Sequence, residues 1–396
     1  MEAREIRGIQ IAEKGGLEQT KNGWYVPAQG GYGKYFVERK DGHYVCNCPD
    51  CQTRGVTCKH GYAVMHTISK TIDHQGNTTI TETKKVTYPQ DWKAYNKAQT
   101  SEITSFDELL KDLVENIDEP SQEIGRPRLS LKASLFCSVQ KVYSQLSSRR
   151  AYTLYKNAKE REQVNKVPNF NAINKFLNRE EITPILHQLL TITALPLRSV
   201  ETTFAPDSSG FRTTQFNQYC IEKHGTKKQH QWVKAHILVG TKTNVIASAQ
   251  ITGENGADTT QFNPLLTEAF NGGFTIKEVV ADKAYTSRAN YNLANELGAT
   301  AYLPFKSRDS GYSRGSVTWK RMYHYFMLNR DEFMQHYHQR SNVESAFNMI
   351  KAKFGDKLKS KNKKAQENEL LCKLICHNIC CLIQEMHELR VNPKFN

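Results

Sequence analysis

The second half of the chain has an order of secondary-structure elements that few folds share. From residue 196 on, apolar patterns predict strands within "FRTTQFNQY", "QWVKAHILVGTKTNVIASAQIT", "IKEVVADKAY" and "TAYLPF". Helices are predicted by "DTTQFNPLLTEAF" and "SRANYNLANELGA", which lie between the later strands. Strand, strand, strand, helix, strand, helix is the order expected of a mixed sheet flanked by helices, so we expect an α/β fold.

Two acids stand where ligand-binding groups often gather in such a sheet. Asp207 lies in "FAPDSSGF", where a predicted strand meets a Ser-Ser-Gly break, and Asp282 ends the apolar strand "IKEVVAD". Strand ends and adjoining loops commonly carry ligand-binding groups, but a lone Asp at a strand end more often caps a turn. Asp258 and Glu254 are nearby acids that we interpret as loop and helix-start residues.

The stretch "YHQRSNVESAFNMIK" adds four polar side chains at helical spacing. Tyr337, Arg340, Glu344 and Lys351 fall within about 60° of one another at ~100° per residue. A solvated helix face also carries mixed charges. Whether these four side chains have a function therefore depends on what they face in the folded protein. If Glu344 faces the two Asp residues, Arg340 can grip a phosphate with its planar fork, Tyr337 can stack or hydrogen-bond, and Lys351 supplies a point charge for a second phosphate.

Three carboxylates from two strand ends and one helix suit divalent metal chemistry. Asp207, Asp282 and Glu344 can together hold two cations about 3.5–4 Å apart. Mg²⁺ prefers such hard oxygen ligands and keeps several waters. One cation lowers the pKa of a water or a DNA 3′-hydroxyl, and the other stabilises the leaving oxygen. These acids are therefore the candidate catalytic residues and magnesium ligands.

These motifs resemble a known family. Asp207 in "PDSSGF", Asp282 in "ADKAY" and the run Tyr-x2-Arg-x3-Glu-x6-Lys are similar to the DDE transposases of prokaryotic insertion sequences, and the run matches their YREK signature without a gap. The resemblance covers about residues 120 to 390. It implies a ribonuclease-H-like fold, Mg²⁺ or Mn²⁺, and phosphodiester hydrolysis followed by strand transfer. Between Asp282 and Glu344 the chain leaves no room for the large β-rich insertion of some relatives.

The charge of the chain favours a polyanionic partner. The 396 residues carry a formal net charge of +14, which suits double-stranded DNA better than it suits solubility alone. Two transposon ends must be joined, so we expect a homodimer or higher oligomer on DNA. No signal peptide and no membrane-spanning run is predicted, since "LLCKLICHNICCLI" is too short. We expect a cytoplasmic protein associated with the nucleoid of a prokaryotic cell.

A cluster of metal-ligating residues occupies "YVCNCPDCQTRGVTCKH". The preceding "GKYFVERKDGHYVCNC" predicts a β-hairpin around an Asp-Gly turn, so Cys46 and Cys48 should point to the same side. Cys58 and His60, which lead into the helix "GYAVMHTI", would complete a tetrahedral zinc site. The pattern resembles the SWIM zinc finger, a module tied to DNA or protein binding. Cys51 lies outside the pattern; it either replaces Cys48 as a ligand or is spare.

The predicted organisation has four parts. These are a SWIM-type zinc finger (1–68), a polar linker (69–104), a helical helix-turn-helix-like DNA-binding region (105–195) and a ribonuclease-H-like catalytic domain (196–396). In the helical region one helix should start at Ser105 and another at Asn169. The second would read DNA through Asn171, Asn174 and Lys175. A bundle that only supports the catalytic domain is the alternative.

Other functions remain open from sequence. The same residues would suit a domesticated transposase that binds DNA as a regulator without cleaving it, or an endonuclease that hydrolyses without joining strands. Near the carboxyl terminus, Cys372, Cys376 and Cys380 recur every four positions beside His377. We interpret them as a buried helix stripe rather than as a second metal site, because cysteine buries readily.

Overall fold

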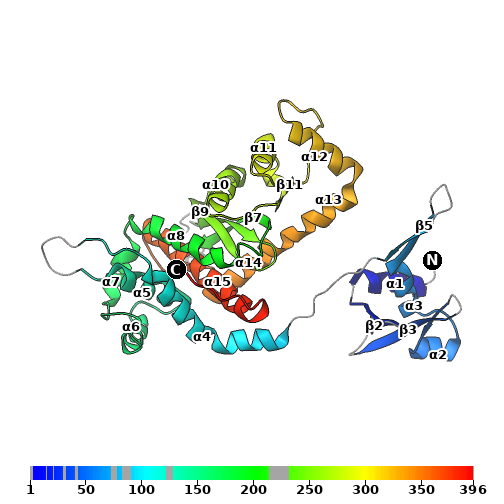
Figure 1. The fold of residues 1–396 in the computed structure, drawn as a ribbon, viewed down its shortest axis with the longest axis horizontal. Helices are drawn as coiled ribbons and strands as arrows, with labels where there is room; N and C mark the ends of the chain where they lie inside the picture. Colours follow the sequence, from blue (N-terminus) through cyan, green and yellow to red (C-terminus); the bar gives the residue numbers. More distant parts are fainter. Residues whose placement is uncertain are drawn as a thin grey trace, which may run out of the picture. The chain divides into compact units, whose positions relative to one another are not determined.

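The computed structural model describes residues 3–14, 16–20, 22–29, 33–40, 43–72, 78–82, 91–121, 128–213 and 232–395. The chain divides into two compact units, Met1–Gln90 and Asp91–Asn396, and each is described by itself (Figure 1). Among the described residues, no helix combines the length and apolar character that crossing a membrane requires.

The first unit is built on a small antiparallel sheet. Its strands follow one another in the order β1 (Glu18–Thr20), β2 (Gly23–Pro27), β3 (Lys34–Lys40) and β4 (His43–Cys46). The helices are α1 (Ala3–Lys14), α2 (Pro49–Arg54) and α3 (Lys59–Thr67), and a separate hairpin pairs β5 (Ile68–Ile72) with β6 (Thr78–Glu82). The predicted hairpin is confirmed in β3 and β4, although its Asp-Gly turn lies outside the described residues.

The second unit begins with five α-helices and a short 3-10 turn. They are α4 (Trp92–Glu115), α5 (Leu131–Tyr143), α6 (Ala151–Glu160), α7 (Phe170–Leu177), α8 (Ile182–Ala194) and η1 (Leu195–Leu197). The start of α7 is as predicted: Asn169 caps it by accepting a hydrogen bond from the backbone of Asn171. Helix α7 buries Ile173, Phe176 and Leu177 and packs against α5 and against the last helix, α15 (Lys363–Glu388).

Helix α4 starts earlier than the sequence predicted. Residues from Trp92 on were expected to belong to the linker, with Ser105 as a helix start, but Ser105 lies inside α4. Asp91 is the cap, because its carboxylate accepts hydrogen bonds from the backbone of Lys93 and Ala94. The small buried residues Ala94 and Ala98 continue the apolar face of α4, which packs against α15.

A five-stranded mixed sheet forms the centre of the second unit. Its order is β11 (Thr300–Tyr302), β10 (Glu278–Val280), β7 (Thr203–Arg212), β8 (Trp232–Gly240) and β9 (Ile246–Gly253). Strands β7, β8 and β9 are antiparallel, whereas β10 and β11 run parallel to β7. Helix α10 (Asp258–Asn271) connects β9 to β10, and α11 (Arg288–Glu296) connects β10 to β11. The predicted α/β class, a ribonuclease-H-like mixed sheet flanked by helices, is confirmed.

Strand β7 does not end where the sequence suggested. It continues through the Ser-Ser-Gly segment to Arg212, pairing with β8 from Phe204–Gly240 to Arg212–Trp232. Gly210 allows this, because a Cβ there would lie 3.1 Å from the ring of Trp232. Asp207 is therefore in the middle of a strand, and its expected position at a strand end is wrong. Most of the predicted strand "FRTTQFNQY" lies outside the described residues.

The carboxy-terminal helices include α12 (Val317–Leu328), α13 (Arg330–Tyr337), a 3-10 turn η3 (His338–Arg340), α14 (Ser341–Phe354) and α15. Figure 1 shows α12 and α13 projecting from the sheet and α14 returning to it. After α14, Asp356 accepts a hydrogen bond from the backbone of Arg212 at 2.9 Å, and Leu358 donates one back at 2.8 Å. The buried ammonium of Lys373 in α15 donates to the carbonyls of Gly355 and Lys357. The end of α14 is thus fixed to the end of β7.

Helix α15 is the main core helix of the second unit. Cys372 and Cys376 are fully buried along it, as predicted for a packed stripe. His377 donates a hydrogen bond from Nε2 to the carbonyl of Asn244 at 2.9 Å. Asn378 bonds both backbone groups of Ile246 in β9. In the part of the chain that the structure describes, these residues form no cluster suited to a metal ion.

Glu385 in α15 should make the second unit less stable as the pH rises. Burial, together with the charges of Glu388 and Glu201, raises its pKa from 4.5 to about 7. The folded state then holds the proton more tightly than the unfolded state, so stability falls between pH 4.5 and pH 7, by up to ~3 kcal/mol. Urea denaturation at pH 5 and pH 8 should show that Glu385→Gln removes most of this difference. Glu296→Gln on the surface of α11 is the control, and equal pH dependence in both variants would contradict the prediction.

Candidate functional site

The register of the sheet brings Asp207 and Asp282 to the same level. Strand β10 pairs with β7 at Glu278–Thr203 and Val279–Phe204. If this parallel register is continued past the end of β10 at Val280, Asp282 falls at the level of Asp207. Asp282 caps the 3-10 turn η2 (Lys283–Tyr285) that follows β10, and its carboxylate accepts the backbone N–H of Lys283.

The third acid approaches from a helix that lies on the sheet. Glu344 is in the first turn of α14, which packs against β7. Lys351, later in α14, donates a hydrogen bond to Ser209 of β7 at 2.7 Å and lies over the ring of Phe211. Ser209 is two residues from Asp207, so both side chains point to the α14 face of β7. The packing of α14 therefore directs Glu344 and Lys351 toward the strand that carries Asp207.

One guanidinium lies among the three acids. Arg340 donates from Nη1 to Glu344 Oε1 at 2.9 Å, and its Nη2 lies 4.0 Å from Asp207 Oδ2 and 4.0 Å from Asp282 Oδ2. The three carboxylates are remote in sequence, yet each is within ion-pair distance of this side chain. They are not gathered into a tight ligand cluster like the one found in the first unit. The guanidinium of Arg340 thus supplies positive charge close to all three carboxylates.

The helix expected to carry the stripe is not continuous. Tyr337 ends α13, Arg340 ends η3, and Glu344 and Lys351 lie in α14. A single helix across all four residues is therefore wrong, because the 3-10 turn tightens the backbone between them. Arg340, Glu344 and Lys351 still face the acids or β7, while Tyr337 is half-buried at the edge of the group.

The charges of this group depend on one another. Burial raises the pKa of Asp207, whereas the backbone N–H of Ser208 and the charge of Arg340 act against this rise. Burial alone would lower the pKa of Arg340, but the surrounding negative groups, with Asp207 first among them, raise it. A positive neighbour therefore favours the ionised form of Asp207, a role that a divalent cation or Arg340 can fill.

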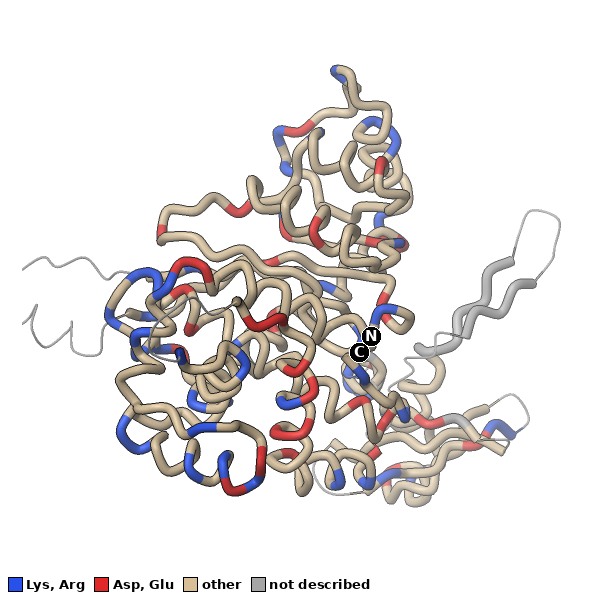
Figure 2. Tube along the Cα trace, turned by 60° about the vertical axis from the view of Figure 1, so that its left-hand side comes forward, with Lys and Arg blue, Asp and Glu red and all other residues tan. Residues whose placement is uncertain are grey.

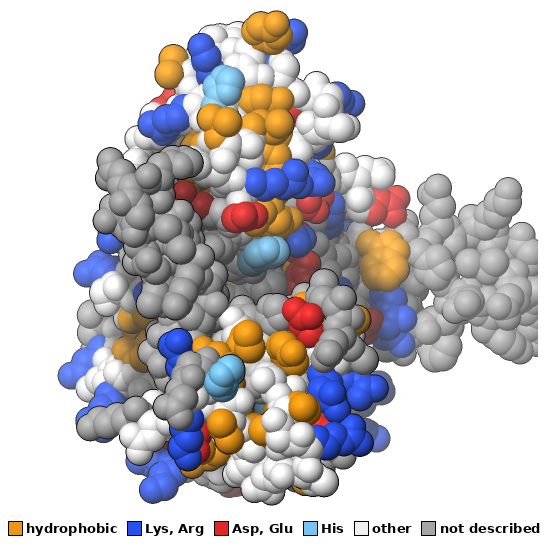
Figure 3. All heavy atoms as spheres, turned by 90° about the vertical axis from the view of Figure 1, so that its right-hand side faces the viewer, with side chains coloured by type: hydrophobic (Ala, Val, Ile, Leu, Met, Phe, Trp, Pro, Cys, Tyr) orange, Lys and Arg blue, Asp and Glu red, His pale blue; other side chains and the backbone are white. Residues whose placement is uncertain are grey.

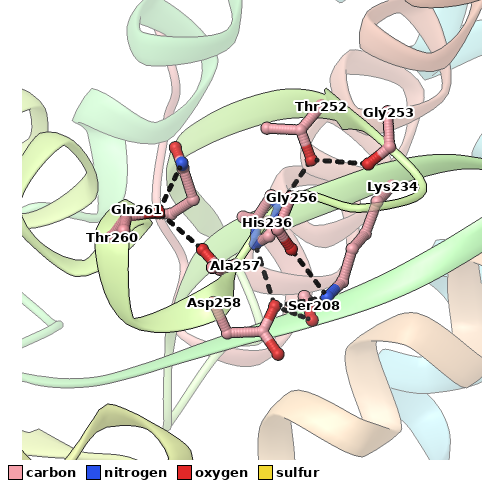
Figure 4. Close-up of polar contacts among 10 residues, drawn as sticks. All are labelled: Ser208, Lys234, His236, Thr252, Gly253, Gly256, Ala257, Asp258, Thr260 and Gln261. Atoms are coloured by element: carbon pink, nitrogen blue, oxygen red, sulfur yellow. Dashed lines mark hydrogen bonds and ion pairs between the residues drawn. The ribbon is translucent and has the colours of Figure 1, made fainter.

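A polar network that the sequence did not reveal lies on the other face of β7. Asp258, the first residue of α10 as interpreted from the sequence, accepts hydrogen bonds on Oδ1 from Ser208 at 2.7 Å and from Lys234 at 2.5 Å (Figure 4). His236 Nδ1 lies 3.4 Å from the same oxygen, and its Nε2 contacts Thr252 at 2.8 Å. Ser208 follows Asp207 directly, so this network fixes the strand beside the first acid. Only cross-strand pairing brings these residues together, which periodicity does not indicate.

A cavity of about 470 Å³ adjoins the acids. Lys283 and Tyr337 connect it to Asp282 and Arg340, and its wall combines aromatic and basic side chains: Phe305, Tyr323, Phe326, Lys306 and Arg330. Figure 3 shows Lys and Arg side chains flanking apolar ones on the part of the molecule formed by α11–α13, the upper part in that view. The surface beside the acids is therefore both apolar and positively charged.

The Cys/His cluster of the first unit has the donor set of a structural zinc site. Ligand atoms of Cys46, Cys48, Cys58 and His60 all lie within 4.8 Å of one another, and all four residues are buried. His60 Nδ1 is 3.8 Å from Cys46 Sγ and 3.7 Å from Cys58 Sγ. A tetrahedron with Zn–S distances of ~2.3 Å and Zn–N distances of ~2.0 Å has edges of about this length. The residues fit zinc, with Nδ1 as the imidazole ligand.

The local geometry of this cluster differs from the sequence prediction in one respect. Strand β4 ends at Cys46, and Cys48 precedes α2 rather than continuing the strand, because Pro49 begins the helix. Both thiols still reach the cluster. Cys51 is not part of the group: its sulfur accepts the backbone N–H of Cys46 at 3.4 Å. Of the two alternatives for Cys51, the structure favours the one in which Cys51 is not a metal ligand and Cys48 is.

Comparison with known protein families gives a match whose residues include the three acids Asp207, Asp282 and Glu344. Residues 198–379 match the model described as Transposase DDE domain. This segment, somewhat under half of the chain, is similar to the DDE domain of transposases. The matched segment contains Asp207, Asp282 and Glu344, together with Tyr337, Arg340 and Lys351. A cryo-EM structure of a piggyBac transposase synaptic complex with hairpin DNA is also similar, at 11% identity over 75% of each chain with a TM-score of 0.35.

Proposed function

We propose that this protein is a transposase that cleaves DNA at transposon ends and joins the freed 3′-hydroxyls to target DNA. The observation that carries the proposal is the group formed around Arg340 in the DDE domain. Asp207, Asp282 and Glu344 reach one guanidinium from two neighbouring strands and a helix. Such an arrangement concentrates negative charge that a pair of divalent cations would neutralise.

Asp207, Asp282 and Glu344 are the proposed ligands of Mg²⁺ or Mn²⁺. Their oxygens are the hard donors that these ions prefer, and Asp207 and Asp282 lie at one level of the sheet. When bound, the ions supply an activated oxygen nucleophile and stabilise the leaving oxygen. The chain's own part is to hold the three carboxylates in place and to favour the ionised form of Asp207 despite its burial. Arg340 does the latter while no cation is present.

The DNA strand is proposed to lie along α14 and the adjoining cavity. Arg340 and Lys351 offer a fork and a point charge for backbone phosphates, and Tyr337 lines the cavity with other aromatic and basic side chains. Stacking platforms and positive charge together suit a nucleic acid strand. Other lysines after Glu344 are already engaged, as Lys353 pairs with Glu102 and Lys364 with Glu367. These two lysines are therefore less available for contact with DNA than Lys351.

The helices α5, α6 and α7 are the proposed DNA-binding region. Basic side chains are exposed along α6, α7 and their loops, among them Arg149, Arg150, Lys156, Lys159, Lys166, Lys175 and Arg179. Figure 2 marks the Lys and Arg positions of the chain in blue along the trace. On α7, Asn171 and Lys175 are exposed and available to read bases. Asn174 is different, because its Oδ1 accepts hydrogen bonds from Lys141 and Ser148. Its proposed role is to hold α7 on α5 rather than to read a base. For the zinc-finger unit we propose a DNA or protein contact.

Cleavage and joining can be tested together. A plasmid carrying the DNA that flanks the gene on both sides would be incubated with the protein, Mg²⁺ and a second supercoiled plasmid as target. We expect Mg²⁺-dependent nicks at the element ends and joined products between the two plasmids, both suppressed by EDTA. Tight, specific binding without any nick would favour the regulator, and nicks without joined products would favour an endonuclease. Analytical ultracentrifugation of the DNA complex tests the expected homodimer.

A further inference from the structure

Glu201 is a fully buried carboxylate to which nothing above assigns a role. It precedes β7, and 0% of its surface is exposed. Its Oε1 accepts hydrogen bonds from the backbone N–H of Lys242 at 3.0 Å and from the backbone N–H and the hydroxyl of Thr243 at 2.6 and 2.8 Å. A Cβ at Gly240 would lie 2.4 Å from the carboxyl carbon of Glu201, so the end of β8 contacts this side chain directly. Glu201 thus organises the turn of residues 241–244 that joins β8 to β9.

One carbonyl of this turn accepts a hydrogen bond from α14. Asn342 donates from Nδ2 to the carbonyl oxygen of Thr241 at 2.6 Å. Thr241 is itself buried, and its N–H donates to the carbonyl of Thr203 in β7 at 3.0 Å. Its hydroxyl also lies 3.4 Å from Gln339 Oε1 in η3. The junction between η3 and α14 is therefore attached to a turn that the sheet and Glu201 hold in place.

Asn342 stands two residues after Arg340 and two residues before Glu344, but it points to the other side of the helix. At ~100° per residue, Asn342 and Glu344 are about 160° apart around the axis of α14. The apolar face of the helix lies between them and consists of the buried residues Val343, Ala346, Phe347, Ile350 and Phe354. Glu344 therefore flanks this face on the side of the acids, and Asn342 flanks it on the side of Thr241.

The roll of α14 about its own axis decides where Glu344 points. Hydrophobic packing is non-directional, so an apolar face restrains this roll less sharply than a hydrogen bond does. A roll of about 10° moves a carboxylate at ~6 Å from the axis by about 1 Å, and a misplacement of ~1 Å can cost about 100-fold in rate. Lys353, about three turns after Asn342 on the same flank, pairs with Glu102 of α4 and holds the far end of the helix. The bond of Asn342 is the corresponding attachment next to Glu344.

We propose that Asn342 is a positioning residue: its hydrogen bond to the turn organised by Glu201 sets the roll of α14 and thereby directs Glu344 toward the other two acids. This inference rests on the proposed function, since it requires that the three acids bind a cation. Loss of the bond should leave α14 packed on the sheet, because the apolar face is unchanged. Glu344 would then turn away from the other two carboxylates, and a cation that needs all three would be held less tightly.

The chain offers a matched control. Asn116, which follows α4, donates from Nδ2 to the carbonyl of Phe395 at 3.2 Å. Leu has the branched shape of Asn but no donor, so Asn342→Leu and Asn116→Leu each remove one side-chain hydrogen bond to a backbone carbonyl. One such bond contributes little to the stability of the whole unit, so the melting temperature should fall by no more than about 2–4 °C in either variant.

The two variants should differ in metal binding. We would titrate the zinc-loaded full-length protein and each variant with Mn²⁺, following the ion by electron paramagnetic resonance, with Asp282→Asn to identify binding at the acids. Asn342→Leu should weaken this binding by about 10–100-fold, as expected for a group that orients a metal ligand. It should also slow the nicking of plasmid DNA while the affinity for DNA in a gel-shift assay stays unchanged. Asn116→Leu should match the wild type in all three measurements, and Asn342→Ala, which lacks the same donor, should behave as Asn342→Leu does.

Four results would overturn the proposal. The first is wild-type Mn²⁺ affinity in Asn342→Leu, which leaves the three acids as a metal site and refutes only the role of the asparagine. The second is a melting temperature that falls much further in Asn342→Leu than in Asn116→Leu, since the bond would then serve stability. The third is weak Mn²⁺ binding in Asn342→Ala but not in Asn342→Leu, which would assign the effect to side-chain volume. The fourth is a wild-type protein without any Mn²⁺ binding that Asp282→Asn removes, which refutes the proposed metal site and this inference together.

Discussion

Replacing Asp282 by Asn should abolish the metal-dependent cleavage of DNA by this protein. The amide keeps the size and the capping position of the carboxylate at η2, where Asp282 accepts the backbone N–H of Lys283. It removes the negative charge and the hard oxygen donor that a divalent cation needs. Changes to groups that only orient metal ligands cost about 10–100-fold, so loss of a ligand should cost more than ~100-fold in cleavage rate.

The measurement is the rate of nicking of a plasmid that carries the element ends, at saturating Mg²⁺. Asp118→Asn is the control, because this exposed acid lies between α4 and α5, away from the acidic group. The variant should retain DNA binding in a gel-shift assay and should melt at the temperature of the wild type. A variant that still nicks DNA within a few-fold of the wild-type rate would remove Asp282 from the proposed mechanism.

Removal of zinc should unfold the first unit and leave the second unit folded. The core of the first unit is small, and four of its buried members are the cysteines at positions 46, 48, 51 and 58. A core with so few buried side chains provides little hydrophobic stabilisation, so we expect the unit to depend on the metal. Structural zinc contributes ~10–16 kcal/mol of binding free energy in comparable peptides, and this becomes folding free energy. Without the ion, the buried Cys46, Cys48 and Cys58 would crowd around His60 with no charge to compensate a thiolate.

Hydrogen exchange of the full-length protein resolves the two units. After treatment with a strong zinc chelator, the amides of β2–β4 should lose protection, whereas those of β7–β9 should keep it. Cys58→Ser should have the same effect without chelator. Cys380→Ser in α15 serves as the control, since Cys380 lies outside the cluster. Protection that persists in β2–β4 after complete loss of zinc would show that the metal is not needed for folding.

The sequence was informative where the signal is local. Apolar periodicity located most helices and strands of residues 198–379, and Asn169 and Asp258 stand at helix starts as their side-chain chemistry suggests. It failed where partners are remote. A Ser-Ser-Gly segment favours a turn locally, yet pairing with β8 extends β7 through it. Local propensity in strands is readily overridden by such cross-strand contacts.

The acidic group itself was only partly predictable. Spacing along a helix brought Arg340 and Glu344 to one side, but it gave no sign that Arg340 would lie between all three acids. That position depends on the level of Asp282 relative to Asp207 across β10 and β7, which is a property of strand register. The partners of Asp258 likewise depend on the pairing of β7 with β8 and on the packing of α10.

The attachment of the segment after α14 to the end of β7 has a consequence for how the protein can vary. Backbone hydrogen bonds between Arg212 and residues Asp356 and Leu358 fix the far end of α14 to the strand that carries Asp207. The position of Glu344 along the axis of α14 is thereby fixed by the carboxyl-terminal end of this helix. It does not depend on the length of the chain that precedes the helix. Segments inserted ahead of α13 could thus grow or shrink over evolution while the acids stay aligned. Deletion of one residue after Phe354 would instead shift α14 along its axis and move Glu344 away from Asp207 and Asp282.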